Sequence, residues 1–184
     1  MKEEETITAE DQKLLLQLAR ASIAKKLNID HPAPEIKPGP PFSLNRGAFV
    51  TLHKAGRLRG CIGTFSTQNS LKTTVEEMAQ AAAFQDPRFP PLRAEELPEV
   101  DLEISVLTPM RKIESPEEIE VGRHGIYIVQ GFYSGVLLPQ VATENHWDRQ
   151  TFLEQTCLKA GLDRDCWSSK ETQIFVFSAQ VFGE

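Results

Sequence analysis

The spacing of apolar and polar residues predicts a chain of mixed helices and strands. Apolar residues recur at the helical interval of three or four positions over residues 8–27 and again over residues 70–85. Thr8 can cap the first of these helices. A third helix is expected over residues 148–160, where Gly161 follows at the position that favours a positive φ angle.

Strands are predicted where apolar and polar residues alternate or where β-branched and aromatic residues gather. The expected strands are residues 49–53, 58–65, 100–107, 126–129, 136–138 and 173–182. The first two form a hairpin whose turn lies at Ala55 and Gly56, and the fourth and fifth form a second hairpin around residues 131–135.

Proline separates these elements and helps to assign the fold class. Five prolines lie within residues 31–41, so this stretch is either an extended connector on the surface or a loose loop. A second proline-rich segment, residues 86–91, ends the helix before it. Helices and strands do not alternate as in parallel βαβ folds. We therefore expect an α+β fold with a mostly antiparallel sheet flanked by helices.

Composition excludes several classes of protein. The 184 residues are 40% hydrophobic and 25% charged, which is typical of a globular domain and not of a disordered or fibrous chain. A net charge of -6 argues against a broad nucleic-acid-binding surface. No apolar run reaches the roughly 20 residues of a membrane span. The acidic start is unlike a signal peptide, and we expect a cytoplasmic protein.

The cysteine count points in the same direction. Cys61, Cys157 and Cys166 form no close pair in the sequence, which predicts reduced thiols. Cys157 falls on an apolar helical stripe and Cys166 precedes a tryptophan, so both are expected to pack inside the protein. No zinc-type spacing occurs, and no metal site is expected. The sequence identifies no cofactor.

The densest chemical signal is the segment RLRGCIGT at residues 57–64. Cations near a cysteine favour the reactive thiolate, and Arg59 lies two positions from Cys61, on the same side of a strand. Gly60 and Gly63 leave the backbone open to a close ligand. Packing offers another explanation, because cysteines are often buried and glycines also mark bulges.

His53 is the candidate base for this cysteine. If residues 54–57 form a four-residue turn, Val50 pairs with Cys61 and His53 pairs with Leu58. His53 and Cys61 would then point to opposite faces of the sheet. A slip of one residue in the register reverses this prediction.

Other candidate residues lie near the ends of elements or on a polar strand face. Arg88 either binds a carboxylate or phosphate, or locks its turn by pairing with Asp86. Gln140 and Glu144 follow the end of a predicted strand, where sites often lie. Glu103 faces away from the apolar side of its strand, toward solvent or the floor of a cleft.

These segments together resemble the AMMECR domain family, whose prokaryotic members are labelled AmmeMemoRadiSam system protein A. The resemblance covers nearly the whole chain and is carried by the following stretches: GAFVTLHKAGRLRGCIGTF at 47–65, DPRFPPL at 86–92, LEISVLTP at 102–109, RHGIYI at 123–128 and GVLLPQVATENHWDRQTFL at 135–153. The combination of LRGCIG with DPRF and LLPQVA is specific.

What the resemblance implies is mostly architecture. It implies a single α+β domain over residues 1–184, with a larger and a smaller subdomain formed by sequence-distant segments and a cleft between them. It places Arg59, Gly60, Cys61 and Gly63 in a signature motif. The family has no established reaction, and its association with Memo-like and radical-SAM proteins suggests a shared modification pathway.

Two functions fit these observations. In the first, the chain is an enzyme or enzyme component in which Cys61 is a nucleophile or redox thiol and Glu144 or His53 moves the proton. In the second, it is a non-catalytic binding or adaptor module for a small anion or a partner protein. In either case the residues predicted to form the binding site are Arg59, Gly60, Gly63, Asp86, Arg88, Glu103 and Gln140.

Overall fold

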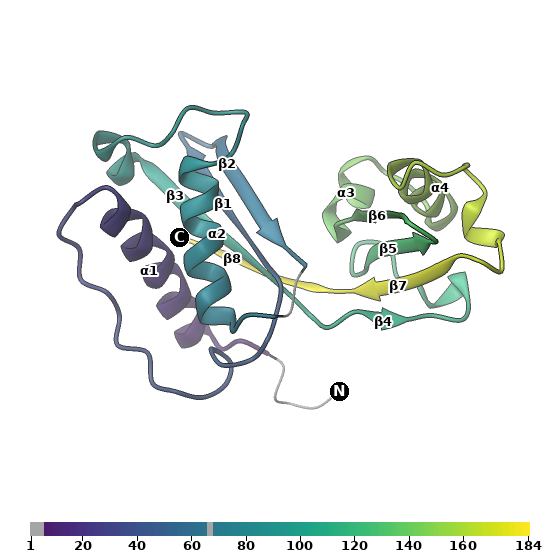
Figure 1. Ribbon diagram of the computed structural model, residues 1–184, viewed down its shortest axis with the longest axis horizontal. Helices are drawn as coiled ribbons and strands as arrows, with labels where there is room; N and C mark the ends of the chain where they lie inside the picture. Colours follow the sequence, from purple (N-terminus) through teal and green to yellow (C-terminus); the bar gives the residue numbers. More distant parts are fainter. Residues whose placement is uncertain (1–5, 66–67) are drawn as a thin grey trace. The chain divides into compact units, whose positions relative to one another are not determined.

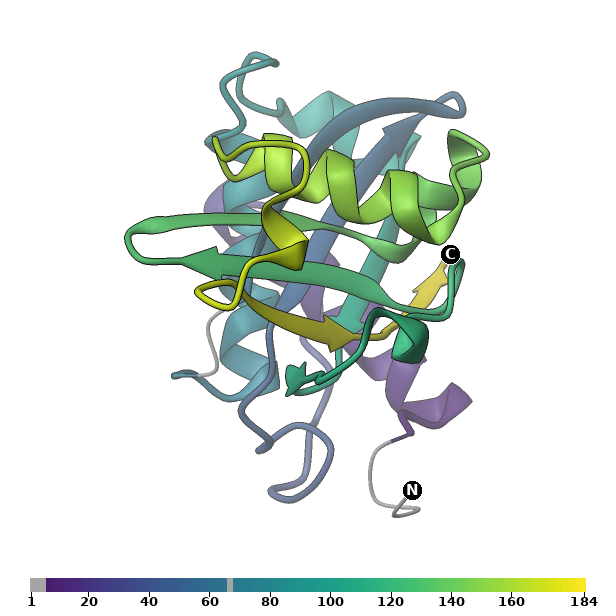
Figure 2. The same ribbon diagram turned by 90° about the vertical axis from the view of Figure 1, so that its right-hand side faces the viewer.

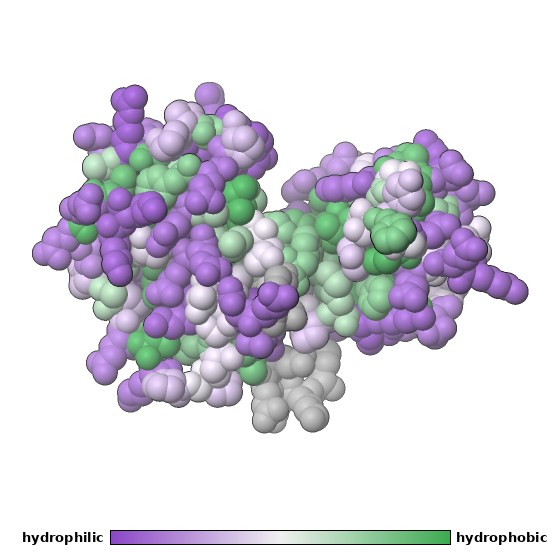
Figure 3. Space-filling view, in the orientation of Figure 1, coloured by the Kyte–Doolittle hydropathy of each residue, from purple (hydrophilic) through white to green (hydrophobic). Residues whose placement is uncertain are grey.

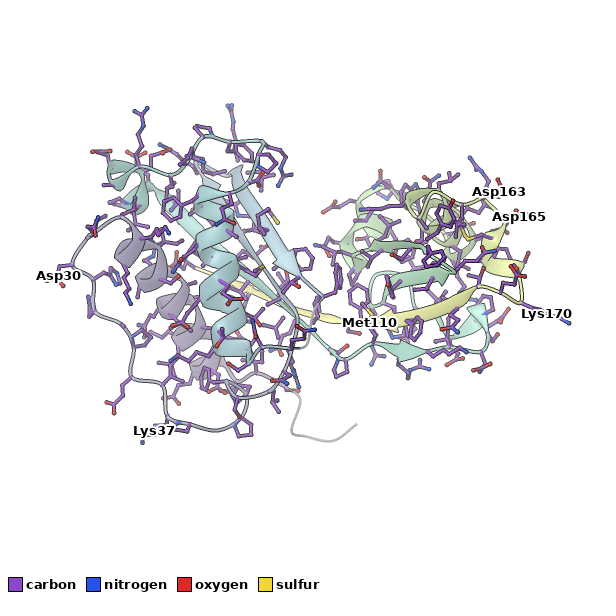
Figure 4. The ribbon with its side chains drawn as sticks, in the orientation of Figure 1. Asp30, Lys37, Met110, Asp163, Asp165 and Lys170 are labelled. Atoms are coloured by element: carbon purple, nitrogen blue, oxygen red, sulfur yellow. A yellow bond between two sulfur atoms is a disulfide. The ribbon has the colours of Figure 1, made fainter. Side chains whose placement is uncertain are left out.

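The computed structural model describes residues 6–65 and 68–184, and the chain separates into two compact units. One unit runs to Leu107 and takes in Gln180–Glu184, and the other comprises Thr108–Ala179. The chain therefore passes between the units twice (Figure 1). Met110 lies on the first of these passages (Figure 4). Within the described residues, no helix has the length and apolar character that a membrane span requires.

The first unit is a four-stranded sheet covered by two helices. Its elements are α1 (Ala9–Lys26), β1 (Ala48–Lys54), β2 (Arg57–Thr64), α2 (Leu71–Phe84), the 3₁₀ helix η2 (Ala94–Glu99), β3 (Val100–Leu107) and β8 (Ala179–Gly183). The strand order is β2-β1-β3-β8, with β1 antiparallel to both β2 and β3. α2 packs against β1 and β2, and α1 packs against α2 and β3, so both helices cover one face (Figure 1).

Alternation along the strands explains why this face carries the core. In β1, Ala48, Val50 and Leu52 are buried, whereas the residues between them are half-buried. Hydrophilic side chains cover much of the outer surface of the two helices (Figure 3). α2 lies very close to the sheet at Gly60. A Cβ atom at this position would come within 2.2 Å of the carbonyl oxygen of Ala82 in α2, so only glycine fits without a shift.

The second unit repeats the same plan on a smaller scale. Its elements are β4 (Arg111–Lys112), the 3₁₀ helix η3 (Pro116–Glu118), β5 (Gly125–Gln130), β6 (Tyr133–Leu137), α3 (Pro139–Glu144), α4 (Arg149–Lys159), the 3₁₀ helix η4 (Cys166–Ser168) and β7 (Gln173–Phe177). The strand order is β4-β7-β5-β6. α4 packs against β5 and β6 (Figure 2), and Phe152 and Leu153 of α4 are fully buried.

Most of the expected elements are confirmed, including the α+β class and the antiparallel sheets. α1 begins at a capping box formed by Thr8 and Asp11, and Gly161 ends α4 with a φ angle of +77°. Two expectations are wrong. The single strand expected over residues 173–182 is two strands that pair in different sheets, and the short helix α3 follows β6 where no helix was expected.

The expectation that all cysteines are reduced is also wrong. Cys157 on α4 and Cys166 on η4 form a disulfide, although nine positions separate them in the sequence. Both residues are buried, as expected, and lie within the core of the second unit. Cys61 is the free cysteine. The disulfide therefore ties the end of α4 to the segment that leads into β7.

We predict that this disulfide stabilises the second unit. Closing a loop of this length restricts the unfolded chain and adds about 2–3 kcal/mol to the free energy of unfolding. Dithiothreitol should lower the thermal midpoint of the second unit in the wild type but not in a Cys157→Ala/Cys166→Ala double variant. Cys61→Ala is the control and should keep the wild-type response. Rapid alkylation of all three cysteines in the native, unreduced protein would contradict the prediction.

The contact between Gly60 and α2 gives a second prediction. Gly60→Ala places a methyl group against a backbone carbonyl that cannot rotate away, so the free energy of unfolding should fall by about 1–3 kcal/mol. Leu58→Ala is the control, because Leu58 is exposed on the same strand and should change stability by less than about 0.5 kcal/mol. Equal stability of the two variants in chemical denaturation would show that the helix shifts without cost.

Candidate functional site

A bulge in the first hairpin sets the direction of Cys61. Cys61 lies opposite Thr51, and Leu58 lies opposite His53, with a shift in register between Leu52 and His53. The predicted pair of His53 with Leu58 is confirmed, but the predicted pair of Val50 with Cys61 is wrong, because β2 contains one extra residue. Cys61 therefore shares a sheet face with Thr51 and His53, so the expectation of opposite faces is also wrong.

Two side chains from the segment after α2 hold the backbone of Cys61. β2 is an edge strand, so the outward N–H and C=O groups of Cys61 have no neighbouring strand. The Cys61 amide donates to Asp86 Oδ2 at 2.9 Å, and Arg88 Nη2 donates to the Cys61 carbonyl at 3.2 Å. We call this arrangement the Asp86–Arg88 clamp. Its two hydrogen bonds replace, for this one residue, the backbone hydrogen bonds that a further strand would make.

The clamp is itself a strong ion pair. Arg88 donates to Asp86 through Nε at 2.9 Å and through Nη2 at 2.7 Å. The hydrogen bonds from Arg88 hold the pKa of the buried Asp86 carboxyl far below its usual range, against the opposing effect of burial. The same hydrogen bonds raise the pKa of Arg88, and the negative charges of Asp86 and of a Cys61 thiolate act in that direction too. The interpretation that Arg88 locks its turn by pairing with Asp86 is therefore confirmed. Because the Arg88 side chain is still 54% exposed, binding of a carboxylate or phosphate stays a prediction.

Polar side chains line the sheet face that carries the Cys61 thiol. The Thr51 hydroxyl donates to Cys61 Sγ at 3.2 Å. Glu103 lies opposite Thr51 on the other side of β1, so these three residues form a row across three adjacent strands. His53 follows Thr51 on the same face. All four of these residues are half-buried. Sequence reasoning missed Thr51, which only the correct register reveals.

The hydrogen-bond partners of Arg59 are Glu96 and the Pro90 carbonyl. Its guanidinium group donates to Glu96 through Nε at 3.1 Å and through Nη2 at 3.0 Å, and also to the Pro90 carbonyl at 3.0 Å. These hydrogen bonds from Arg59 lower the pKa of Glu96 to about 2. The Phe89 ring lies near both motif arginines, 6.0 Å from the guanidinium carbon of Arg59 and 5.6 Å from that of Arg88. Nothing in the sequence singles out Glu96 as the partner of Arg59.

Close packing explains why residues 60 and 63 are glycines. A Cβ at Gly60 would strike Ala82 of α2, and a Cβ at Gly63 would lie 2.1 Å from the ring of Phe49. The space beside both residues is therefore filled by protein. A ligand that approaches their backbone stays a prediction.

The remaining candidates lie in the second unit. Gln140 and Glu144 are exposed on the short helix α3, and their side chains point away from the core around Ala142. That they join Cys61 in one cleft stays a prediction. Among the described residues, no group of three or more His, Cys, Asp or Glu side chains is arranged to hold a metal ion.

The clamp predicts a pH-dependent contribution to stability. Asp86→Asn should lower the free energy of unfolding of the first unit by about 1–3 kcal/mol at pH 7, since one partner is half-exposed. Because the pKa of Asp86 is depressed below its ordinary value of 3.8, this contribution is complete above about pH 5 and is lost progressively as the pH falls further. Hydrogen exchange of the β1 and β2 amides at pH 7 and pH 3 measures the difference.

The control for this variant is Asp30→Asn, whose side chain projects outward from the connector (Figure 4). It should behave as the wild type at both pH values. A loss in Asp86→Asn that is equally large at pH 3 and pH 7 would contradict the electrostatic explanation.

Comparison with known proteins agrees with this fold. A model of the AMMECR1 family matches residues 16–182. A protein of Methanopyrus kandleri is 45% identical over 189 residues, covering 98% of this chain and 91% of its own length. A Pyrococcus furiosus protein is 41% identical and covers 92% of this chain and 86% of its own length. The crystal structure of the uncharacterised protein PH0010 from Pyrococcus horikoshii is 39% identical, with a TM-score of 0.84, and covers 97% of this chain and 93% of its own. The chain therefore belongs to the AMMECR1 family.

Proposed function

We propose that this protein is an enzyme, or an enzyme component of a modification pathway shared with Memo-like and radical-SAM proteins, and that Cys61 carries its chemistry. The observation that supports this most directly is the 3.2 Å hydrogen bond from the Thr51 hydroxyl to Cys61 Sγ on a polar sheet face. A donor aimed at sulfur favours the thiolate, which is the nucleophilic form of cysteine.

The proposed step is attack of Cys61 on an electrophilic carbon of the substrate. The thiol proton passes to a base, the sulfur electron pair forms the S–C bond, and the leaving group departs with the electrons of the bond that breaks. His53 and Glu103 are the candidate bases in the first unit, since both lie on the face that carries Thr51. Glu144 is the candidate from the second unit.

Arg88 is proposed to bind an anionic group of the substrate. The clamp engages Nε and Nη2 of Arg88, and Nη1 takes no part in it. A carboxylate or phosphate bound at Nη1 would lie next to the residue that carries the thiol. Asp86 limits the strength of this site, because its charge already offsets that of Arg88.

One observation favours the alternative of a non-catalytic binding module. Arg59, the expected activator of the thiol, is paired with Glu96 and bound to the Pro90 carbonyl. A guanidinium group neutralised in this way stabilises a thiolate less than a free cation does. In this alternative Arg88 and the backbone around it bind a small anion or a partner protein without chemistry at Cys61.

Alkylation of Cys61 separates the two functions. If Cys61 is a nucleophile, iodoacetamide should modify it in the native protein at pH 7 at least as fast as in the unfolded chain. Thr51→Val should slow the reaction by about three- to tenfold, because the hydrogen bond to sulfur is lost. Peptide mass spectrometry after timed quenching gives the rate. His53→Gln and Glu103→Gln should show which side chain accepts the proton.

Inorganic phosphate is the probe for the anion site. Phosphate should slow alkylation of the wild type but not of Arg88→Gln, and Arg57→Gln is the matched control from the exposed end of β2. A Cys61 that stays inert until the protein unfolds would refute the enzymatic proposal. Calorimetric binding of phosphate to such an inert protein would then support the binding module.

A further inference from the structure

The first unit contains a cavity whose lining is mostly charged. It has a volume of about 580 Å³ and lies between the end of the first hairpin, the segment before η2, and η2 itself. Its charged lining residues are Lys54, Arg59, Arg93, Glu95, Glu96 and Glu99, and Pro90 forms part of its wall. This volume falls within the range of small-molecule sites.

Arg59, which lines the cavity, contains a hydrogen-bond donor without an acceptor in the described part of the chain. The Arg59 side chain is only 10% exposed, and its Nη1 atom has no hydrogen-bond partner among the described residues. Buried donors are nearly always satisfied in folded proteins, by protein, water or ligand. Glu96 and Pro90 already engage the other two nitrogens of the guanidinium group. Nη1 has almost no accessible surface, so an acceptor reaches it only when the side chains around it shift.

The rim of the cavity carries both signs of charge. Lys54 pairs with Glu99 at 2.7 Å and with Glu96 at 3.3 Å. Arg93 and Glu95 are exposed, and neither takes part in an ion pair within the part of the chain that the structure describes. One positive and one negative side chain thus remain available at the same opening.

The balance of charges restricts the chemistry of a ligand. Three cations and three carboxylates line the cavity, so a simple anion meets three carboxylates and a simple cation meets three positive groups. A molecule that carries one charge of each sign meets a partner for both. Its carboxylate lies toward Arg59 and Arg93, and its ammonium group lies toward Glu95.

We propose that this cavity binds a zwitterionic ligand of the amino-acid or short-peptide class. The carboxylate of the ligand pairs with Arg93 and, once the side chains around Arg59 shift, supplies the acceptor that Nη1 lacks. The site is separate from the Cys61 thiol and does not depend on the proposed chemistry there. The two sites are connected through the Phe89 ring, which lies near both Arg59 and Arg88.

Three related dipeptides test the proposal on the full chain. Glycylglycine carries both charges at pH 7, N-acetylglycylglycine carries only the carboxylate, and glycylglycinamide carries only the ammonium group. Glycylglycine should shift the backbone amide signals of residues 93–97 and of Glu99 saturably in ¹⁵N-¹H spectra. Each singly charged analogue should bind at least about threefold more weakly, because one ionic contact is lost.

Variants at the rim assign the two charges. Arg93→Gln should weaken glycylglycine by about three- to fivefold and should leave the affinity for glycylglycinamide unchanged. Glu95→Gln should weaken glycylglycine to a similar extent and should leave the affinity for N-acetylglycylglycine unchanged. Both residues are exposed, so the variants are expected to fold.

Lys170→Gln and Glu171→Gln are the matched controls, since both residues are exposed in the second unit and Lys170 projects outward (Figure 4). They should bind all three dipeptides as the wild type does. Absence of saturable shifts, or equal affinity for all three dipeptides, would overturn the proposal and leave the cavity to water.

Discussion

The Asp86–Arg88 clamp is the contact on which the candidate site depends. An edge strand exposes backbone groups that would otherwise pair with any other strand, and a buried carboxylate is stable only when it is fully paired. The clamp meets both requirements at once, because Asp86 accepts from the Cys61 amide and Arg88 donates to the Cys61 carbonyl. Both outward backbone groups of Cys61 are therefore fixed at the outer edge of β2. The side chain of Cys61 therefore points onto the sheet face that carries Thr51.

Arg59 and Arg88 stabilise the fold through ion pairs, and this pairing reduces the positive charge that could attract a ligand. Each is paired with a carboxylate, Arg59 with Glu96 and Arg88 with Asp86, and the Phe89 ring lies near both guanidinium groups. Neutralised pairs produce only a weak long-range field. Recognition here therefore has to rely on short-range hydrogen bonds, which agrees with the net charge of -6 for the whole chain. The basic appearance of the RLRG sequence overstates the positive charge that a ligand meets.

Local patterns predicted the elements well, and failures occur where distant residues decide. α1 and β3 follow from periodicity and capping alone. The register at Cys61 was wrong because Gly60 indicates a possible bulge but does not fix where the extra residue, Arg59, is inserted. The strand over residues 173–182 divides at Ser178, where strand-forming residues continue on both sides but the pairing partner changes. The disulfide and the pair of Arg59 with Glu96 join residues whose proximity only the folded chain reveals.

The geometry of the sheet limits which base can serve Cys61. Neighbouring strands lie about 4.8 Å apart, so Glu103, two strands away from Cys61, is roughly 10 Å from it across the sheet. At that separation Glu103 reaches the thiol proton only through the Thr51 hydroxyl or a water. His53 is a diagonal neighbour across one strand pair, at about 7–8 Å, which long side chains can span. Direct proton transfer therefore favours His53. A role for Glu103 requires a relay, which is either a water or a Thr51 hydroxyl that turns from donating to Sγ to accepting from it. Loss of Thr51 removes one of these two relays but leaves His53 in place.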